Sequence, residues 1–370
     1  MKIRTITCHD HANYGASLQA FALQQYLSKQ GHDVKIIDYL PQYIKTYDIW
    51  RLYPSSKLYT LAKRFHIIHA IYALHRYIQI RPTMGRIKAF EAFKNKYLHL
   101  TDHYQSFLEL ANNPPEADIY IAGSDQIWNT NLENGKDASY FLQFGTEKTK
   151  RISYAASFGI ESITSGLEFQ IKSYLKRLDS ISVRETSGVT ILNQLNISGC
   201  QVVDPVFLLS NQEWMQSFNI EKNKKHITKP YILVYELFGG DKRISNTAQI
   251  IAKEKKLQIV AINDLYKKKY ADINITDGSP VDFVNLISNA EFVIADSFHA
   301  TAFSIIFHKP FLIYYNKNNI SRMKDLLSGL NLLKHLNSPT IYYDINWSEV
   351  DLLLQNSIIK SKTYLSEHLK

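Results

Sequence analysis

The spacing of apolar residues along the chain predicts that strands and helices alternate from the first residues onward. Residues 3–8 (IRTITC) form a short run rich in β-branched side chains, which is typical of a strand. From Gly15 to Gly31 the apolar residues recur every three or four positions, which predicts a helix with one buried stripe. Residues 33–39 (DVKIIDY) then return to a strand-like pattern. A strand, a helix and a second strand in this order form a βαβ unit, so we expect a parallel sheet.

The same alternation continues along the chain and predicts two Rossmann-like domains, residues 1–210 and 211–345. Further strands are expected at 118–123, 151–159, 180–183 and 200–204, and then at 231–237, 257–263, 291–296 and 310–315. We also expect a helical insertion at about 50–100, a polar linker with a short helix around Trp214 at 211–229, and terminal helices at 346–370. Two α/β domains that face each other across a cleft form a GT-B-like architecture, in which ligands bind beyond the carboxyl ends of the strands.

Composition places the chain among globular proteins. Hydrophobic residues make up 45% and charged residues 21% of the chain, which excludes a disordered protein. No apolar run is long enough to span a bilayer, and the N-terminus lacks the apolar segment of a secretory signal. Cys8 and Cys200 have no metal-ligand spacing and cannot form a disulfide framework. We therefore expect a cytoplasmic protein without a bound metal.

The net charge of +9 is compatible with an anionic membrane surface or an anionic substrate as binding partner, or with a contribution to solubility alone. The lysines are scattered and no basic face is interleaved with aromatic residues, so no nucleic-acid partner is expected. Within the insertion, residues 64–81 resemble a basic amphipathic helix, with Ile67, Ile71, Leu74 and Ile78 on one side and His66, His69 and Arg76 on the other. Such a helix lies at a membrane interface or packs on the domain core.

Two loops of the N-terminal domain carry candidate binding residues. In the loop 9–19, Asn13, Tyr14 and Gly15 stand at a helix N-terminus, where backbone N–H groups favour an anion. In the loop 122–129 (AGSDQIWN), Gly123 and Ser124 allow a tight turn, Asp125 offers a base or a hydrogen-bond acceptor for sugar hydroxyls, and Trp128 offers a flat face for a sugar. The alternative for both loops is an ordinary helix cap, with Trp128 in the core.

The C-terminal domain offers a third junction, in which a strand ends at Asp296 and a helix begins at Ser297 or Phe298. His299 lies in the first turn of this helix, and Thr301 keeps the helix surface small enough for a ligand to approach. The alternative is a structural histidine. Arg184 and Glu185 follow the predicted strand 180–183, and arginine binds carboxylate or phosphate through two parallel hydrogen bonds. The alternative for Arg184 and Glu185 is an ion pair at the surface, which contributes little to stability. Arg322 is a weaker candidate for anion binding.

Taken in order, these segments resemble the polysaccharide pyruvyl transferase family. The resemblance is carried by NYGASLQAFALQQYLSKQGHDVKIIDY (13–39), GSDQIWN (123–129), YAASFG (154–159), SVRE (182–185), VDPVFLL (203–209) and DSFHATAFSIIFHKPF (296–311). It implies a GT-B-like fold, phosphoenolpyruvate as the donor, and a pyruvate ketal on a hexose of a cell-surface polysaccharide or of its lipid-linked precursor. Contact with the cytoplasmic face of the inner membrane is then expected, and no cofactor beyond the donor.

The family builds its donor site from an arginine of the N-terminal domain and an Arg-x-His element of the C-terminal domain. Arg184 matches the arginine and His299 matches the histidine, but Ser297 stands where the element has its arginine. Arg322 or a helix N-terminus is a candidate substitute. The expected donor-binding residues are Arg184, Ser297, Phe298, His299, Thr301 and Arg322. The expected acceptor-binding residues are Asn13, Tyr14, Gly15, Gly123, Ser124, Asp125 and Trp128.

These residues support an addition mechanism, with His299 as acid or phosphate ligand and Asp125 or Glu185 as base for the attacking hydroxyl. Two other functions stay open. One is a glycosyltransferase of the same fold, which would bind a nucleotide-sugar at its C-terminal domain. The other is a non-catalytic glycan-binding protein of envelope assembly, which would bind the acceptor without turning over any donor.

Overall fold

The structure is a computed structural model of the chain and describes residues 1–10, 12–41, 43–44, 64–220, 227–263, 267–315 and 321–370. Its N-terminal domain contains a five-stranded sheet in the order β3-β2-β1-β4-β5, with every pair of strands parallel. The strands are β1 (Lys2–Ile6), β2 (Asp33–Tyr39), β3 (Leu100–Tyr104), β4 (Ile119–Ala122) and β5 (Lys150–Ser153). β4 is buried along its whole length, as expected for the interior of a parallel sheet with helices on its faces.

Two short strands extend this domain beside β5. β6 (Ser182–Val183) and β7 (Cys200–Gln201) form a parallel pair, and isolated bridges connect the β6 segment to the β5 segment. These strands are shorter than the expected 180–183 and 200–204. Arg184 follows the end of β6 directly, and Asp204 lies three residues beyond β7.

The C-terminal domain contains a second parallel five-stranded sheet, in the order β10-β9-β8-β11-β12. Its strands are β8 (Tyr231–Tyr235), β9 (Gln258–Ile262), β10 (Ile273–Ile275), β11 (Phe292–Ala295) and β12 (Phe311–Ile313). Its helices are α9 (Lys242–Lys255), α10 (Pro280–Asn289), α11 (Phe298–Ile306) and α12 (Ser321–Gly329). The two domains confirm the expected α/β, GT-B-like class.

The remaining helices belong to the N-terminal domain, the insertion and the C-terminus. They are α1 (Tyr14–Lys29), α3 (His66–Ile80), α4 (Met84–Tyr97), α5 (Phe107–Asn112), α6 (Glu168–Leu175), α7 (Thr186–Gln194), α8 (Asn211–Phe218) and α13 (Trp347–His368). Short 3-10 turns are η1 (Arg81–Thr83), η2 (Asn134–Lys136), η3 (Ala138–Phe141), η4 (Pro205–Leu208) and η7 (Leu333–His335). Within the described part of the chain, none of these helices combines the length and the apolar character that crossing a membrane requires.

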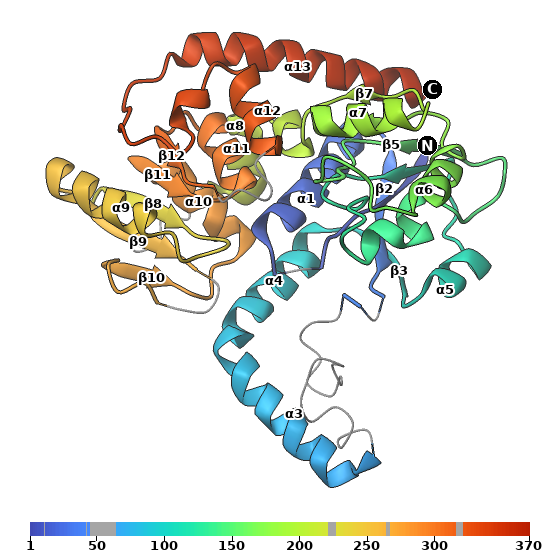
Figure 1. Cartoon of the computed structure of the whole chain (residues 1–370), viewed down its shortest axis with the longest axis horizontal. Helices are drawn as coiled ribbons and strands as arrows, with labels where there is room; N and C mark the ends of the chain where they lie inside the picture. The colour runs from blue at the N-terminus through green and yellow to red at the C-terminus, as the bar shows by residue number, and fades with distance from the viewer. Residues whose placement is uncertain (11, 42, 45–63, 221–226, 264–266, 316–320) are drawn as a thin grey trace.

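The two domains share one hydrophobic core. Tyr14 at the start of α1 stacks on Phe283 of α10 with ring centroids 4.5 Å apart, and its hydroxyl donates to the Gly278 carbonyl at 2.9 Å. Trp214 of α8 is fully buried against Phe303 of α11, so α8 is a core element rather than part of a polar linker. α13 then returns from the C-terminal domain and packs across the N-terminal domain (Figure 1).

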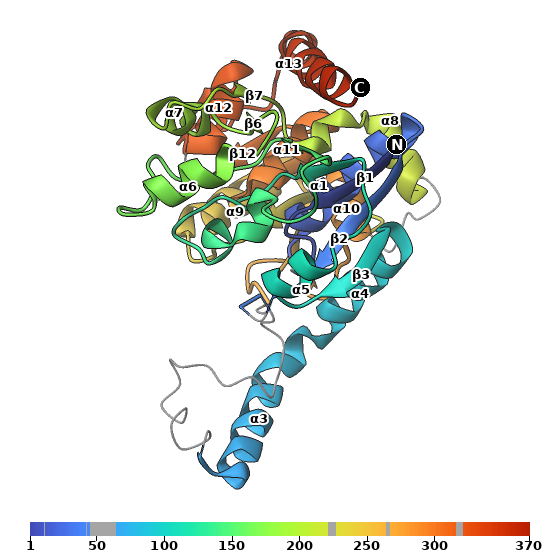
Figure 2. The same ribbon diagram turned by 90° about the vertical axis from the view of Figure 1, so that its right-hand side faces the viewer.

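The expected insertion at about 50–100 forms an arm that projects away from both domains (Figures 1 and 2). Residues 45–63 lie outside the described residues, and the arm is described from residue 64 onward. α3 forms its outer part, and α4 leads back to β3 at the edge of the N-terminal sheet. The stripe of Ile67, Ile71, Leu74 and Ile78 is exposed to solvent, so this face of α3 does not pack on the domain core.

Candidate active site

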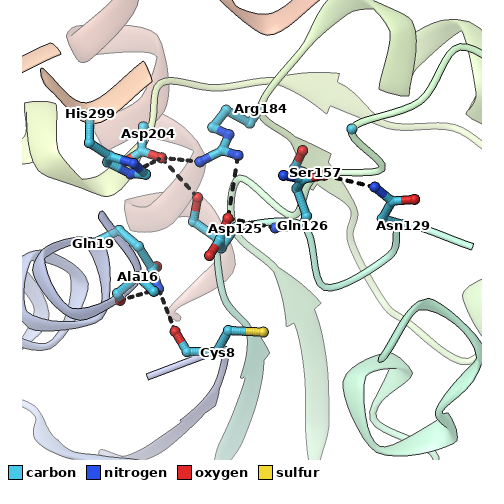
Figure 3. A network of polar contacts seen from close by, with 12 residues as sticks. Cys8, Ala16, Gln19, Asp125, Gln126, Asn129, Ser157, Arg184, Asp204 and His299 are labelled. Carbon is cyan, nitrogen blue, oxygen red and sulfur yellow. Dashed lines mark hydrogen bonds and ion pairs between the residues drawn. The ribbon is translucent and has the colours of Figure 1, made fainter. Parts of the chain in front are cut away.

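A buried arginine–aspartate pair lies where the two domains meet. Arg184 Nη1 donates to Asp204 Oδ2 at 2.6 Å, and both side chains are almost completely buried, at 2% and 0% exposure. His299, in the first turn of α11, approaches the same carboxylate from the other domain, with Nε2 at 3.6 Å from Oδ2 (Figure 3). The second residue of the pair, Asp204, was not among the residues predicted from the sequence, although the segment 203–209 was recognised as part of the family resemblance.

The pair is held in its charged form. Burial alone would raise the pKa of the Asp204 carboxyl, but the nearby imidazole of His299 and the charge and hydrogen bond of Arg184 lower it well below its usual range. Burial lowers the pKa of Arg184, and the carboxylates of Asp204, Asp125 and Glu185 reverse this effect, so that its pKa is raised. The cleft therefore contains a permanent guanidinium group away from bulk water.

Several polar atoms of this centre are buried without a hydrogen-bond partner. They are Nε and Nη2 of Arg184, Nε2 of His299 and Oε2 of Glu185. Native proteins leave few such atoms unsatisfied, because each costs about 1–3 kcal/mol when buried. Two of the free groups are guanidinium N–H donors, which suit an anionic ligand with oxygen acceptors.

Asp125 is the carboxylate of this centre that remains open to solvent. It follows β4, has a left-handed backbone with φ of 74°, and places Oδ1 3.8 Å from Arg184 Nη2. Its side chain is 21% exposed. Ser124 next to it is fully buried and donates to Asp204 Oδ2 at 3.1 Å, so Ser124 orients the buried pair rather than contacting a substrate.

Glu185 is buried behind Arg184 and is already partly engaged. Its Oε1 accepts hydrogen bonds from the Ser157 hydroxyl and the Gly159 amide, both at 3.0 Å. Its Oε2 lies 4.0 Å from Arg184 Nε. A carboxylate with 1% exposure cannot reach a substrate hydroxyl without rearrangement, so the structure favours Asp125 over Glu185 as the expected base.

Gly15, at the start of α1, does not make room for a ligand as expected. A Cβ atom added to Gly15 would lie 1.9 Å from His299 Nδ1, so the missing side chain makes room for the histidine rather than for a ligand. Asn13 is the N-cap of α1, and its Oδ1 accepts a hydrogen bond from the Ala16 amide at 3.2 Å. This is the ordinary helix cap given above as the alternative to ligand binding. Tyr14 is buried in the core between the domains and is not available to an acceptor.

Trp128 and Gly123 also differ from expectation. Trp128 is fully buried, stacks on Phe141 at 5.4 Å and donates its indole N–H to the Tyr140 carbonyl at 2.9 Å. Its ring therefore cannot stack on a sugar. Gly123 packs closely against Thr7, because a Cβ at this position would lie 3.1 Å from the threonine Cβ.

The residues of α11 that were expected to bind the donor have different contacts. Ser297 is the N-cap and its hydroxyl accepts from the Ala300 amide at 3.5 Å, while the hydroxyl of the fully buried Thr301 donates to the Ser297 carbonyl at 3.0 Å. Both hydroxyls are thus occupied within the helix. Phe298 lies beneath the Arg184 guanidinium, with Arg184 Cζ 4.9 Å from the Phe298 ring centroid, and supports that group by a cation–π contact.

Arg322 joins Arg184 in a cavity of about 490 Å³, which we call the arginine cavity. The cavity is also lined by Asp204, Phe298 and Lys360. Burial lowers the pKa of Arg322, and the nearby Arg184 lowers it further. None of the described carboxylates forms an ion pair with Arg322. Two buried cationic groups that face one cavity favour an anion between them.

A second cavity of about 420 Å³, which we call the Asp125 cavity, lies on the N-terminal domain. It is lined by Asp125, Asn13, Cys8, Tyr43 and Asn134, among other residues. The Arg184–Asp125 contact connects the two cavities, since each residue lines one of them. The described residues contain no group of three histidine, cysteine, aspartate or glutamate side chains that could hold a metal ion.

Comparison with solved structures shows the fold. The UDP-GlcNAc 2-epimerase of Methanocaldococcus jannaschii, in complex with UDP-GlcNAc and UDP, has a TM-score of 0.50 and 11% identity over 99% of this chain and 100% of that one. The UDP-GlcNAc 2-epimerase of Neisseria meningitidis has a TM-score of 0.47 and 12% identity over 99% and 92%. The ADP-heptose heptosyltransferase II of E. coli has a TM-score of 0.39 and 11% identity over 98% and 100%. These are GT-B-fold proteins.

Comparison of sequences identifies the family. No curated protein matches the chain. The sequence profile named polysaccharide pyruvyl transferase matches residues 13–318, which cover most of both domains and include Arg184, Asp204 and His299 but not Arg322. The match confirms the resemblance that the ordered segments predict. The chain is an enzyme that belongs to the polysaccharide pyruvyl transferase family.

Proposed function

We propose that the protein transfers the enolpyruvyl unit of phosphoenolpyruvate to a hexose of a cell-surface polysaccharide or of its lipid-linked precursor, and closes a pyruvate ketal. The observation that carries the proposal is the position of Arg184 between the two cavities. It offers free N–H donors beside the arginine cavity and lies 3.8 Å from Asp125, which lines the other cavity. A donor held by Arg184 would be next to a hydroxyl held by Asp125.

The arginine cavity fits the charges of phosphoenolpyruvate. Its carboxylate and phosphate need cationic or N–H-rich walls, which Arg184 and Arg322 provide. Arg322 then takes the place of the family arginine that Ser297 replaces. His299 would contact the donor from the C-terminal domain, since its Nε2 is buried at the same centre.

The reaction balances with the groups present. A proton adds to the methylene carbon C3, for which His299 is the proposed acid, and the sugar oxygen forms a bond to C2 while Asp125 accepts its proton. The C2–O bond to phosphate then breaks and releases inorganic phosphate. A second sugar hydroxyl bonds to C2 and loses its proton, which completes the ketal. Arg184 stabilises the charge that moves onto the leaving phosphate.

The test is a binding titration with phosphoenolpyruvate, with UDP-sugars in parallel. Saturable binding of phosphoenolpyruvate should weaken roughly tenfold or more in Arg322→Gln, because a hydrogen bond to a charged group is worth about 1.5–3 kcal/mol. Arg184→Ala should abolish binding. Arg243→Gln is the matched control, because this exposed arginine of α9 pairs with Asp241, lies over the Tyr314 ring and lines neither cavity.

The rival function is a glycosyltransferase that uses a nucleotide-sugar. The helix cap at Ser297, in place of an arginine, is the observation that favours it. Binding of a UDP-sugar without any response to phosphoenolpyruvate would establish the rival and exclude the pyruvyl donor. Because phosphoenolpyruvate is a cytoplasmic metabolite, the proposal also places the reaction on the cytoplasmic side of the membrane.

A further inference from the structure

One face of α3 exposes a continuous row of large apolar side chains. Ile67, Ile71, Leu74 and Ile78 are 78%, 56%, 59% and 61% exposed, and their spacing of four, three and four residues places them on one side of the helix. We call these four residues the outer α3 face. Tyr72 and Ala73 are only 5% and 3% exposed, so a different side of the helix is the covered one.

The outer α3 face is unlike the rest of the described surface. No other described helix exposes four large apolar residues on one side. Figures 1 and 2 show α3 projecting beyond both domains, so the face is not the rim of the cleft. At a rise of about 1.5 Å per residue, the row is roughly 17 Å long. A contiguous apolar surface of this kind marks an interaction site.

The charged residues in the sequence of the insertion have one sign. The sequence contains no aspartate or glutamate from residue 49 to residue 90, and eight lysines and arginines in the same stretch. Arg64 and Arg81 are exposed at the two ends of α3, and Tyr77 is 44% exposed beside the apolar row. The partner of this face must therefore accept apolar side chains and arginine together.

We propose that the outer α3 face binds the surface of an anionic lipid bilayer. An interfacial helix inserts its apolar row at the boundary of headgroups and acyl chains, and arginines at its ends reach the lipid phosphates. A second copy of this chain fits less well. Two such faces would bring arginines against arginines, with no acidic residue between 49 and 90 to pair with them.

Docking through α3 would also bring the proposed sugar cavity close to the membrane. This step rests on the proposed function. Tyr43 and Ile44, the last described residues before the insertion, line the Asp125 cavity. The root of the arm therefore borders the cavity proposed for the sugar. An enzyme docked through α3 would receive its sugar as a lipid-linked precursor at the membrane surface.

Vesicle flotation tests the docking without donor or sugar, so its outcome does not depend on the proposed reaction. The full chain should float with vesicles of phosphatidylglycerol and phosphatidylcholine, bind phosphatidylcholine vesicles more weakly, and lose binding as salt is raised. In the double variant I71S/L74S, the partition coefficient onto these vesicles should fall roughly tenfold or more, because two apolar anchors are removed. Ile359→Ser on α13, with a wild-type exposure of 58%, is the matched control and should float like the wild type.

A second measurement reports insertion directly. In Tyr77→Trp, the added tryptophan should shift its emission to the blue with anionic vesicles and be quenched by brominated acyl chains, relative to the wild type. The proposal is overturned if I71S/L74S floats as well as the wild type, or if neither vesicle binds. It is also overturned if the wild type self-associates in sedimentation and I71S/L74S is monomeric, which would make the face a contact between two copies.

Discussion

The guanidinium of Arg184 is surrounded by three carboxylates but uses only part of its hydrogen-bonding capacity on them. Asp204 accepts a hydrogen bond at 2.6 Å, whereas Asp125 and Glu185 lie at 3.8 and 4.0 Å. The carboxylates keep the group charged, and the longer distances leave Nε and Nη2 without acceptors. A ligand carboxylate or phosphate would supply those acceptors, which explains how a buried charge can serve as a binding group.

Replacing Asp125 separates binding from turnover. Asp125→Asn should lower kcat by about 10²–10⁴, because it removes the proposed base, and should change donor affinity much less. Steady-state kinetics together with a phosphoenolpyruvate titration measure both quantities. Glu147→Gln, an exposed acidic residue of the N-terminal domain that lines neither cavity, is the matched control and should keep normal turnover. Normal turnover in Asp125→Asn would contradict the role of base.

Asp204 should make stability depend on pH. Its pKa is lower in the folded chain than in the unfolded one, so its contribution is fully present above the unfolded value of about 3.9 and is lost as pH falls through the folded value. We expect the free energy of unfolding of the wild type to fall steeply below about pH 4. In Asp204→Asn the fall should be shallower, and stability at pH 7 should be about 3–5 kcal/mol lower, because Arg184 loses its partner. Urea unfolding across pH measures this, and parallel curves for the two proteins would refute it.

At the scale of elements, the site depends on two helix N-termini that meet across the cleft. α1 and α11 approach so closely that Gly15 touches the His299 ring. Gly15→Ala should displace His299, because the new Cβ would lie 1.9 Å from Nδ1. We expect turnover to fall at least tenfold while the secondary structure persists, as measured by kinetics and circular dichroism.

Ser366→Ala is the control for Gly15→Ala, since this exposed serine of α13 lines neither cavity. Retained activity in Gly15→Ala would show that the position of His299 is not critical. A general loss of folding would appear as lost ellipticity and would be distinguished from a local effect on the histidine.

The elements show which features a sequence reveals. Helix starts such as Asn13 and Ser297 were predictable, because capping depends on residues within one turn. The edge strand β3 (LTDHY) was missed because it is mostly polar, and β10 because it has only three residues. Trp128 was misjudged because its burial depends on Phe141 and Tyr140, which a local pattern cannot place against it.

At the scale of the whole molecule, the sequence indicates which site residues share one sheet edge but not which residues meet across the two domains. The ends of parallel strands share one edge of a sheet, so Asp125 and Arg184 could be expected near each other. The Asp204–His299 contact joins two domains, and its distance depends on how the domains dock. Docking is decided by packing such as that of Tyr14 on Phe283, and no spacing in the sequence reports it.

This shared packing predicts how the molecule unfolds. One hydrophobic cluster includes Tyr14 and Phe21 of α1 together with Phe283 and Phe303 of the C-terminal domain, so calorimetry of the wild type should show a single transition. Tyr14→Ala should destabilise the chain by about 3–5 kcal/mol and divide the transition into two, because it removes a ring that stacks on Phe283 across the domain boundary. Tyr140→Ala removes an equally buried tyrosine from the core of the N-terminal domain alone and should lower Tm without dividing the transition. If Tyr14→Ala still unfolds in one step, the domains are coupled mainly by α13, whose Tyr364 hydroxyl donates to the Ser153 carbonyl at 2.9 Å.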